Sequence, residues 1–510
     1  SNLMEDIFKK YEMTIGIECH VQLKTKTKLF SGSDNDSREK LPNEATSPID
    51  FGLPGMLPVL NKEAVRLAVR AGKALNAKIA NVSRFDRKHY FYPDLPKGYQ
   101  TSQLYQPIIG EGEIIVPLPS GGEVKVRIEH AHLEEDAGKL THFGDHSLVD
   151  LNRAGTPLIE IVSMPDIHSA EEARAYAEEL HKRMVFADIT NGDLYQGNMR
   201  FDVNISARKI GDEKLGTRTE IKNLNSFRSV ERAAQYEFER QVRLLEKGEK
   251  IKQETRGWLD DEQKTFSQRS KEEAQDYRYM PDPDIPPIIL SDEEISKMQA
   301  QFPIMPDYFR DKFSIFELDS SVVEYALSDY RIAELLLATW GDGPWLNGQD
   351  NAMEAIIEFL PEYTLEEHKE NMKRIFNWFA STPSEELDLE KLYKGYLGPR
   401  RLALLAHLVH EKKVSSNGGH QIFLAMFNDE NLRFMPEKIA ENMNLLQVSD
   451  EGEIAKIVDE VMSDAASQKA IEDIRSGNDK AIGFLVGQIM KKSQGKANPA
   501  LAQKLIRERL

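Results

Sequence analysis

Acidic residues occur in two places where ordinary folding would not put them. Glu134, Glu135 and Asp136 are consecutive, and Glu160 is the single acid in residues 158–162, a stretch that otherwise has the apolar pattern of a buried strand. An unpaired charge in a low-dielectric interior costs on the order of several kcal/mol. These acids therefore predict a compensating partner, which is a proton, a base or a metal ion.

A larger set of polar residues on separate predicted strands has the chemistry of a hard-cation site. The set contains carboxylates and one imidazole: Glu18, His20, Glu134, Glu135, Glu160, Asp202 and Glu220. Such ligands suit magnesium or manganese better than a structural zinc. The layout resembles sites in which metals bridge nucleotide phosphates. For each acid taken alone, the competing interpretation is a solvated loop or an ion pair with Arg87, Arg153 or Arg218.

The chain contains no phosphate-binding loop of the GxxxxGK[ST] type, because Gly138-Lys139-Leu140 lacks both the spacing and the final hydroxyl. ATP would therefore bind through metals and scattered basic residues. Residues 85–100 are dense in aromatic and basic side chains and contain Arg87, Lys88 and Lys97. The alternative interpretation of this segment is a packed aromatic corner with snorkelling lysines.

No nucleophile apparatus is recognisable in the sequence. There is no GxSxG elbow, and the single cysteine, Cys19, lies on the predicted inward face of its strand. We therefore expect acyl chemistry to proceed by phosphate activation and not through a covalent enzyme intermediate.

Alternating patterns predict the strands that position these residues. Residues 14–23 alternate strictly, so Glu18 and His20 point to the same face, and residues 200–208 repeat the pattern with Asp202 on the polar face. Helical periodicity lies between these strands, at residues 63–75, 169–184 and 226–247. These elements predict an α+β domain with a large antiparallel sheet.

The second half of the chain has a different pattern. Residues 281–287 contain four prolines, which exclude a helix and mark a boundary. Beyond it the period is helical, through 319–339, 352–359, 365–379 and on to the end. From residue 475 to 510 there are eight basic and two acidic residues, while the whole chain has a net charge of −18. A basic tail on an acidic body suggests contact with a polyanion, and a solvated helix face is the alternative.

The composition limits the compartment and the class of protein. A chain of 510 residues is too long for one core. It has no apolar run of about 18 residues, which argues against a membrane protein, and its first residues do not have the pattern of a secretion signal. A single cysteine excludes intrachain disulfides. We expect a cytoplasmic protein.

Six motifs together resemble one family. They are residues 15–25, 85–103, 132–139, 148–160, 219–227 and 483–491, and they run over essentially the whole chain. The sequence is similar to the B subunits of the aspartyl/glutamyl-tRNA(Asn/Gln) amidotransferases, the GatB/GatE family. Several long motifs in order are far more specific than any short pattern above.

The resemblance implies a fold and an activity. The expected fold is a glutamine-synthetase-like catalytic domain over residues 10–290, a connecting helical domain over 291–360, and a YqeY-like helical tail over 361–510. The expected enzyme is a ligase that uses ATP to phosphorylate the side-chain carboxylate of Glu-tRNA(Gln) or Asp-tRNA(Asn), which ammonia then converts to the amide. The competing hypotheses are a non-catalytic tRNA-binding scaffold and a metal-dependent phosphohydrolase acting on RNA.

Site residues and partners follow from the same resemblance. A magnesium shell is expected from Glu18, His20, Glu135, Glu160, Asp202 and Glu220, while strand parity places Glu134 opposite Glu135 and leaves open which of the two faces the site. The expected catalytic residues are Glu135, Glu160, Lys88 and Lys97, and the expected nucleotide-binding residues are Arg87, Lys88, Lys97 and Arg200. Nothing in the chain resembles a glutaminase, so the resemblance implies two protein partners, an amidase (glutaminase) subunit and the small third subunit of the amidotransferase, with misacylated tRNA held by the basic tail.

Two positions depart from the family pattern. Gln196 stands where the family usually has glutamate, and Phe201 stands where it usually has cysteine. Phe201 lies on the apolar face of its predicted strand, so we expect it in the core. Gln196 matters to the chemistry only if that acid helps to hold the metal.

Overall fold

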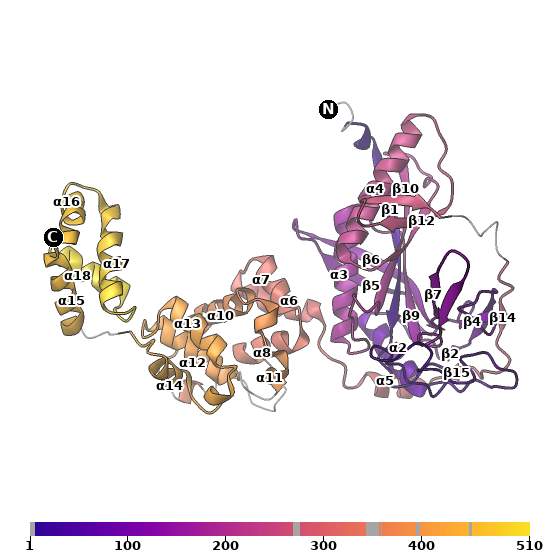
Figure 1. The fold of residues 1–510 in the computed structure, drawn as a ribbon, viewed down its shortest axis with the longest axis horizontal. Helices are drawn as coiled ribbons and strands as arrows, with labels where there is room; N and C mark the ends of the chain where they lie inside the picture. Colours follow the sequence, from indigo (N-terminus) through magenta and orange to yellow (C-terminus); the bar gives the residue numbers. More distant parts are fainter. Residues whose placement is uncertain (1–5, 269–275, 343–355, 359, 394–397, 448–450) are drawn as a thin grey trace. The chain divides into compact units, whose positions relative to one another are not determined.

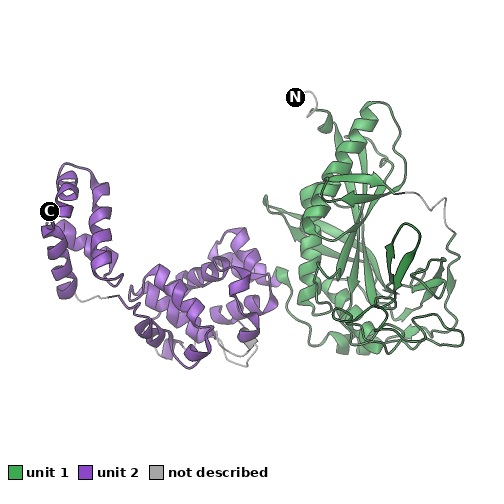
Figure 2. Ribbon diagram, viewed as in Figure 1, with its two compact units in different colours: residues 1–307 green, residues 308–510 purple. Residues whose placement is uncertain are grey.

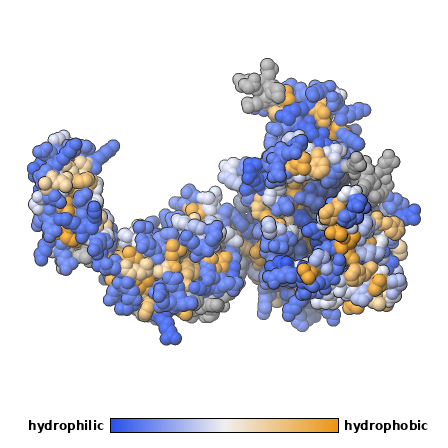
Figure 3. All heavy atoms as spheres, viewed as in Figure 1, coloured by the Kyte–Doolittle hydropathy of each residue, from blue (hydrophilic) through white to orange (hydrophobic). Residues whose placement is uncertain are grey.

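The computed structural model describes residues 6–268, 276–342, 356–358, 360–393, 398–447 and 451–510. The chain divides into two compact units, residues 1–307 and 308–510 (Figure 2). On the face shown in Figure 3, hydrophilic residues predominate in both units and hydrophobic residues are scattered among them. The first unit contains strands and helices, and the second is helical (Figure 1).

An eight-stranded sheet is the centre of the first unit (Figure 1). Its order is β13-β12-β11-β10-β1-β9-β6-β5, and every neighbouring pair is antiparallel except β11 with β12. The strands are β1 (Tyr11–Gln22), β5 (Gly112–Pro117), β6 (Glu123–Glu135), β9 (Pro157–Ser163), β10 (Met199–Lys209), β11 (Thr219–Leu224), β12 (Thr255–Leu259) and β13 (Lys264–Ser267). The predicted large antiparallel sheet is confirmed, with one parallel pair, β11 and β12, one strand in from its edge.

The two faces of this sheet differ in chemistry. In β1, Ile15, Ile17 and Cys19 are buried in a core shared with α3 (Ala170–Phe186) and α4 (Phe227–Glu246). Cys19 is therefore a core residue, as its strand parity predicted. Because side chains alternate along a strand, the polar residues of β1 point to the face opposite these helices.

Three smaller sheets lie in the same unit. β14 (Met280–Pro281), β3 (Asp86–His89) and β4 (Tyr99–Ser102) form one, β15 (Ile288–Ile289) and β2 (Val82–Ser83) form another, and β7 (Lys139–His142) pairs with β8 (Ser147–Asp150). The basic segment predicted from sequence thus forms β3, β4 and their connection. Pairing of β14 with β3 joins the proline-rich segment to it.

The first unit continues past the proline-rich segment. After β15, α5 (Asp292–Gln299) contacts α2 (Lys62–Ala74), and Gln299 Nε2 donates to the backbone oxygen of Val69 at 3.0 Å. Phe302 then lies against Lys73, whose Nζ is 5.1 Å from the ring centroid. These contacts explain why the unit extends to residue 307, beyond the boundary expected at 290. The finer division into three domains stays a prediction.

The described part of the second unit is built from helices. They are α6 (Pro306–Phe313), which begins at the unit boundary, α7 (Ser320–Ala326), α8 (Tyr330–Trp340), α10 (Leu365–Ala380), α11 (Leu389–Tyr393), α12 (Pro399–His410), α13 (Ser416–Ala425), α14 (Pro436–Asn442), α15 (Glu451–Ser463), α16 (Gln468–Arg475), α17 (Ile482–Lys492) and α18 (Pro499–Glu508), with short 3₁₀ turns between some of them. Most of the helix expected at 352–359 lies outside the described residues. Helices α15 to α18 share one core, from Ile454 to Ile506. Within the described ranges, no helix combines the length and the apolar character needed to cross a membrane.

Candidate functional site

Strand register brings the polar residues together on one face of the large sheet. His20 of β1 is directly opposite Arg200 of β10 on one side and Glu160 of β9 on the other. Glu160 in turn is opposite His132 of β6. Directly opposed residues have Cβ atoms about 4.5–5.5 Å apart. The four residues therefore form one row across four strands.

The first cluster on this face consists of His20, Glu134 and Glu160, and we call it the first group. Nε2 of His20 lies 3.3 Å from Oε1 of Glu134 and 3.6 Å from Oε2 of Glu160. Glu134 is only 5% exposed. Two carboxylates from different strands thus converge on one imidazole in a largely buried position.

The second cluster, Glu18, Asp202 and Glu220, lies next to the first, and we call it the second group. Each of these residues offers an oxygen, and the three oxygens lie within 4.8 Å of one another. A register shift between β10 and β11 accompanies a hydrogen bond from the backbone N–H of Asn223 to Asp202 at 2.9 Å. Nδ1 of His20 is 4.0 Å from Asp202 Oδ2, so His20 connects the two groups.

The electrostatics of both groups reflect crowded negative charge. Burial, followed by the neighbouring Glu160, raises the pKa of Glu18 to about 7. Burial also raises the pKa of Glu220. Burial alone would raise the pKa of Glu160 too, but the hydrogen bond from His132 and the charge of His20 lower it below its usual value. A divalent cation would relieve the same repulsion that otherwise keeps a proton on Glu18.

Two of the predicted cations lie beside these groups. Lys88 of β3 contributes to the lowered pKa of Glu160, and its Nζ lies 4.5 Å from the ring centroid of Tyr277. Arg200 occupies the row itself, opposite His20, and its Nη2 is 3.1 Å from Asp136. Nε of Arg200 is buried and has no hydrogen-bond partner among the described residues. Positive charge therefore faces the carboxylates from β3 and from β10.

Glu135, predicted as a metal ligand, lies outside both groups. Because side chains alternate along β6, Glu134 shares the polar face with His132, whereas Glu135 falls on the other side with the buried Leu133. Glu135 instead forms an ion pair with Lys97 and accepts from the backbone N–H of Thr101 at 3.0 Å. The structure therefore places Glu134, and not Glu135, in the first group, and metal binding by either residue stays a prediction.

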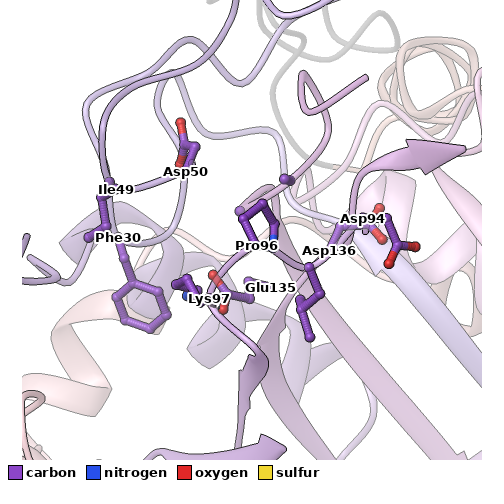
Figure 4. A pocket seen from close by; sticks show the side chains of 11 residues that line it. Phe30, Ile49, Asp50, Asp94, Pro96, Lys97, Glu135 and Asp136 are labelled. Carbon is purple, nitrogen blue, oxygen red and sulfur yellow. Dashed lines mark hydrogen bonds and ion pairs between the residues drawn. The ribbon is translucent and has the colours of Figure 1, made fainter. Parts of the chain in front are cut away.

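The Glu135–Lys97 pair lines a pocket whose walls, among the described residues, contain no member of the two groups, although Glu135 directly follows Glu134 in the chain (Figure 4). Its walls include Phe30, Asp50 and Asp94. Nζ of Lys97 lies 5.9 Å from the centroid of the Phe30 ring. Lys97 is thus held by a carboxylate and an aromatic face within a small pocket that is lined by both charged and apolar residues.

Arg87, predicted to bind the nucleotide, forms ion pairs with two acids of the same unit. Its guanidinium is 3.1 Å from Asp282 and 2.8 Å from Asp284, and it lies 4.3 Å from the centroid of the Tyr99 ring. Adjacent residues on a strand point to opposite faces, so Arg87 turns away as Lys88 approaches Glu160. The structure therefore separates the two neighbours and does not bring Arg87 to the groups.

Sequence reasoning missed two histidines of this region, and it named Asp136 only as one of three consecutive acids that need a compensating partner. His132 is 8% exposed and contacts both carboxylates of the first group, and His130 contacts His132. Asp136 bridges Arg200 and Arg153. Strand parity offered a signal, because His130, His132 and Glu134 are spaced two apart.

The two departures from the family pattern have different settings. Phe201 is fully buried and lies 6.2 Å, centroid to centroid, from Phe227, which confirms the predicted core position. Gln196 is exposed in a turn, where its backbone N–H donates to Asp193 at 3.2 Å. No ligand cluster found among the described residues includes Gln196.

A third cluster occurs in the helical unit, and we call it the helical group. It consists of Glu367 in the first turn of α10, His407 in the last turn of α12 and Glu411, which caps α12. Nδ1 of His407 contacts Oε1 of Glu367, and Glu411 is exposed. An acid at a helix N-terminus and a base at a helix C-terminus are each favoured by the helix dipole.

The donor chemistry of the first two groups fits hard divalent cations. Five carboxylates and one imidazole are available from β1, β6, β9, β10 and β11. Such oxygen-rich sets suit Mg²⁺ or Mn²⁺. Two adjacent sites with nearby cations are typical of enzymes that transfer phosphoryl groups.

Comparison with known proteins gives one consistent family. The family model described as "GatB/GatE catalytic domain" matches residues 13–296, and the one described as "GatB domain" matches residues 362–510. The chain is 44% identical over 505 residues to the aspartyl/glutamyl-tRNA(Asn/Gln) amidotransferase B subunit of Alkalilimnicola ehrlichii, covering 98% of this chain and 99% of that protein. It is 44% identical over 508 residues to the B subunit of Alcanivorax borkumensis, with 98% and 99% covered, and 42% identical over 503 residues to that of Persephonella marina, with 98% and 100% covered.

Proposed function

The chain belongs to the GatB/GatE family of amidotransferase B subunits, and from this premise we propose that it activates the side-chain carboxylate of a misacylated tRNA with ATP. The substrates we propose are Glu-tRNA(Gln), Asp-tRNA(Asn) or both, in agreement with the names of the relatives. The product is the corresponding amide, so the enzyme is a ligase that forms a carbon–nitrogen bond.

One observation carries this proposal: two carboxylate groups are joined through His20 and faced by Lys88 and Arg200. The first group supplies Glu134 and Glu160 with His20, and the second supplies only carboxylates. We propose that both hold Mg²⁺. When bound there, the ions would neutralise the phosphate oxygens of ATP as charge shifts during transfer.

The residues of the chain then act by positioning and by charge. A side-chain carboxylate oxygen of the substrate attacks the γ-phosphorus of ATP, the bond to the β-phosphate oxygen breaks, and ADP leaves. Lys88 and Arg200 approach the groups from two elements, and we propose that they bind phosphate oxygens. Phosphorylation is needed because a carboxylate is a poor electrophile at neutral pH, and positive charge stabilises the transferring group.

The second step makes the amide. The ammonia nitrogen attacks the side-chain carbonyl carbon, the carbon–oxygen bond to phosphate breaks, and one proton leaves nitrogen. We assign the pocket of Glu135 and Lys97 to this half of the reaction, because it adjoins the groups without belonging to them. We propose that Glu135 accepts that proton. Arg87 has no assigned role, since Asp282 and Asp284 already pair with it.

The reaction needs partners that this chain does not supply. Its sequence has no glutaminase motif and no glycine- and serine-rich amidase loop. We therefore propose a complex of three proteins, in which this chain joins an amidase (glutaminase) subunit and a small third subunit, acting in the cytoplasm during translation. The relatives are each named as one subunit of an amidotransferase, which agrees with such a complex.

We propose that the basic tail holds the tRNA. Exposed Lys480, Lys491, Lys504 and Arg507 lie on or beside α17 and α18, while Arg509 pairs with Asp459 at 2.6 Å. A truncation before residue 475 would cut the shared core of α15 to α18, so it would not test charge alone. Replacing the exposed bases by glutamine is the cleaner test. Lower tRNA affinity and a shallower salt dependence are expected, and unchanged affinity would contradict the proposal.

The decisive experiment is amide formation by the reconstituted complex on glutamyl-tRNA(Gln) and, separately, on aspartyl-tRNA(Asn), with ATP, Mg²⁺ and glutamine. Activity that requires both ATP and tRNA is expected and would identify the substrate. Omission of ATP should leave glutamine hydrolysis by the amidase partner as the background reaction. Inactivity on both tRNAs in an intact complex would contradict the proposal and favour a tRNA-binding scaffold.

A further inference from the structure

His132 is a buried histidine that the proposed mechanism leaves without a role. It lies on β6 directly opposite Glu160 of β9, so Glu160 has His20 on one flank and His132 on the other. Only 8% of His132 is exposed. Two imidazoles therefore enclose the carboxylate at the centre of the row.

The contacts of His132 reach both carboxylates of the first group. Its Nε2 is 3.1 Å from Oε2 of Glu160 and 3.3 Å from Oε2 of Glu134. The other oxygen of Glu134, Oε1, faces His20 at 3.3 Å. His132 thus joins two acids from neighbouring strands and divides the oxygens of Glu134 between the two histidines.

The protons of His132 are fixed by these neighbours. Carboxylate oxygens only accept hydrogen bonds, so Nε2 of His132 must carry the hydrogen that it donates. Its Nδ1 lies 3.1 Å from Nε2 of His130, and the two rings are within 19° of parallel. Nδ1 of His130 continues to Glu129 at 3.6 Å. His132 is therefore held on its far side while it donates to the acids.

His20 and His132 differ in what they can reach. The His20 side chain is 23% exposed and approaches Asp202 of the second group in addition to the first group. The His132 side chain is 10% exposed, and its polar contacts among the described residues are with the acids of the first group and with His130. This difference suits His20 as a ligand and His132 as the support behind the ligands. Groups that hydrogen-bond metal-binding carboxylates typically change metal affinity about 10–100-fold when removed.

We propose that His132 is a positioning residue that orients Glu134 and Glu160, so that both converge with His20 on one divalent cation. The inference rests on the proposed function, because it concerns the metal group used for phosphoryl transfer. It adds a residue that touches neither the nucleotide nor the tRNA and acts through the two carboxylates.

The test compares two replacements of His132 in the full chain with its partner proteins. The amide nitrogen of glutamine can stand in for Nε2, whereas leucine removes the donor. His132→Leu should weaken Mn²⁺ binding, measured by titration, about 10–100-fold, and His132→Gln should restore most of the loss. The KM for Mg²⁺ in amide formation should rise in the same ratio, with little change in kcat at saturating Mg²⁺. His142→Gln, an exposed histidine on the β7–β8 hairpin, is the matched control and should match the wild type.

Other outcomes would overturn the inference. Wild-type Mn²⁺ affinity in His132→Leu, or a fall in kcat at saturating Mg²⁺ with unchanged affinity, contradicts a positioning role. If the leucine variant fails to fold, His132→Asn replaces it. The amide nitrogen of asparagine lies where Nδ1 of histidine lies, so asparagine does not restore the donor at Nε2. Equal affinity of the asparagine and glutamine variants would then contradict the inference. Absence of Mn²⁺ binding in the wild type, or full turnover in Glu160→Gln, overturns the proposed function together with the inference.

Discussion

The sheet unit and the helical unit each bring one histidine and two glutamates together, yet the two clusters have different surroundings. In the first group Glu134 is 5% exposed, and the second group, Lys88 and Arg200 lie nearby. In the helical group Glu411 is exposed, and the pair of Glu367 with His407 satisfies two helix termini. The same three residue types can thus form a crowded anionic site or a structural ion pair. Neighbouring charge decides between them, because the side chains of His407 and Glu367 are themselves only 19% and 11% exposed. The residue types alone do not decide.

Replacing one glutamate in each unit by glutamine tests whether each cluster is needed for activity, and we expect the largest effect here. Glu160→Gln should lower the rate of amide formation about 10²–10³-fold, because it removes a charge that the transition state uses. Glu367→Gln is the matched control and should leave the rate unchanged. Single-turnover amide formation on the preferred tRNA measures both. Comparable losses in the two variants would show that the helical group is also functional.

Glu18 in the sheet unit and Glu334 in the helical unit should each make the stability of the protein depend on pH. Burial and Glu160 raise the pKa of Glu18 from 4.5 to about 7, so the folded metal-free protein binds more protons than the unfolded chain between these values. Its stability is therefore fully present below about pH 4.5 and falls, by up to about 3 kcal/mol, as the pH rises through 7. Urea unfolding with a chelator at pH 5 and pH 8 measures this change, which Glu18→Gln should remove.

Glu334 of α8 is the counterpart in the helical unit. Burial alone raises its pKa to about 7, with no neighbouring acid contributing. Mg²⁺ should therefore abolish the pH dependence that comes from Glu18 and leave the contribution of Glu334 intact. A Mg²⁺-independent contribution from Glu18 would contradict a metal at the second group.

Mn²⁺ binding should distinguish the second group of the sheet unit from the helical group. Asp202→Asn removes a proposed oxygen ligand of the second group. We expect Mn²⁺ affinity there to fall at least about tenfold, because loss of a residue that only supports a metal ligand already lowers metal affinity about 10–100-fold. Glu411→Gln should leave both the affinity and the number of bound ions unchanged. Equilibrium dialysis of Mn²⁺ against the full chain measures both quantities. Loss of one bound ion in Glu411→Gln would make the helical group a metal site.

The smallest expected effect is on stability in the helical unit. Glu367→Gln removes an ion pair to His407 and a favourable charge in the first turn of α10. We expect a cost of about 0.5–1 kcal/mol, visible as a small shift in thermal unfolding and reduced by salt. A cost several times larger would show that the pair organises more of the unit than its two helices.

Much of the fold followed from periodicity. Alternation over residues 14–23 and 200–208 predicted β1 and β10, with Glu18 and His20 on a shared polar face, and the structure confirms both strands. The switch to a helical period predicted the second unit. These signals are local, because a strand or helix that buries one face must repeat its apolar residues at a fixed spacing.

The local sequence pattern could not predict which of Glu134 and Glu135 faces the other acids. Parity established that the two point to opposite sides of β6, but either side could have been the site. The register of β6 against β9 settles it, because it sets His132 opposite Glu160 and so puts Glu134 beside both. For the same reason the ion pair of Arg87 with Asp282 could not be predicted, since it joins residues far apart in the chain.

Residue types, periodicity and ordered motifs were enough to predict the family, the fold class and nearly all the acids of the candidate site. Only the folded structure shows which acids share a group, that His20 lies near both groups, and that His132 contacts both acids of the first group. The physical reason is that convergence depends on the register between strands that are distant in sequence. A shift of one residue in that register would turn every polar side chain of a strand toward the core.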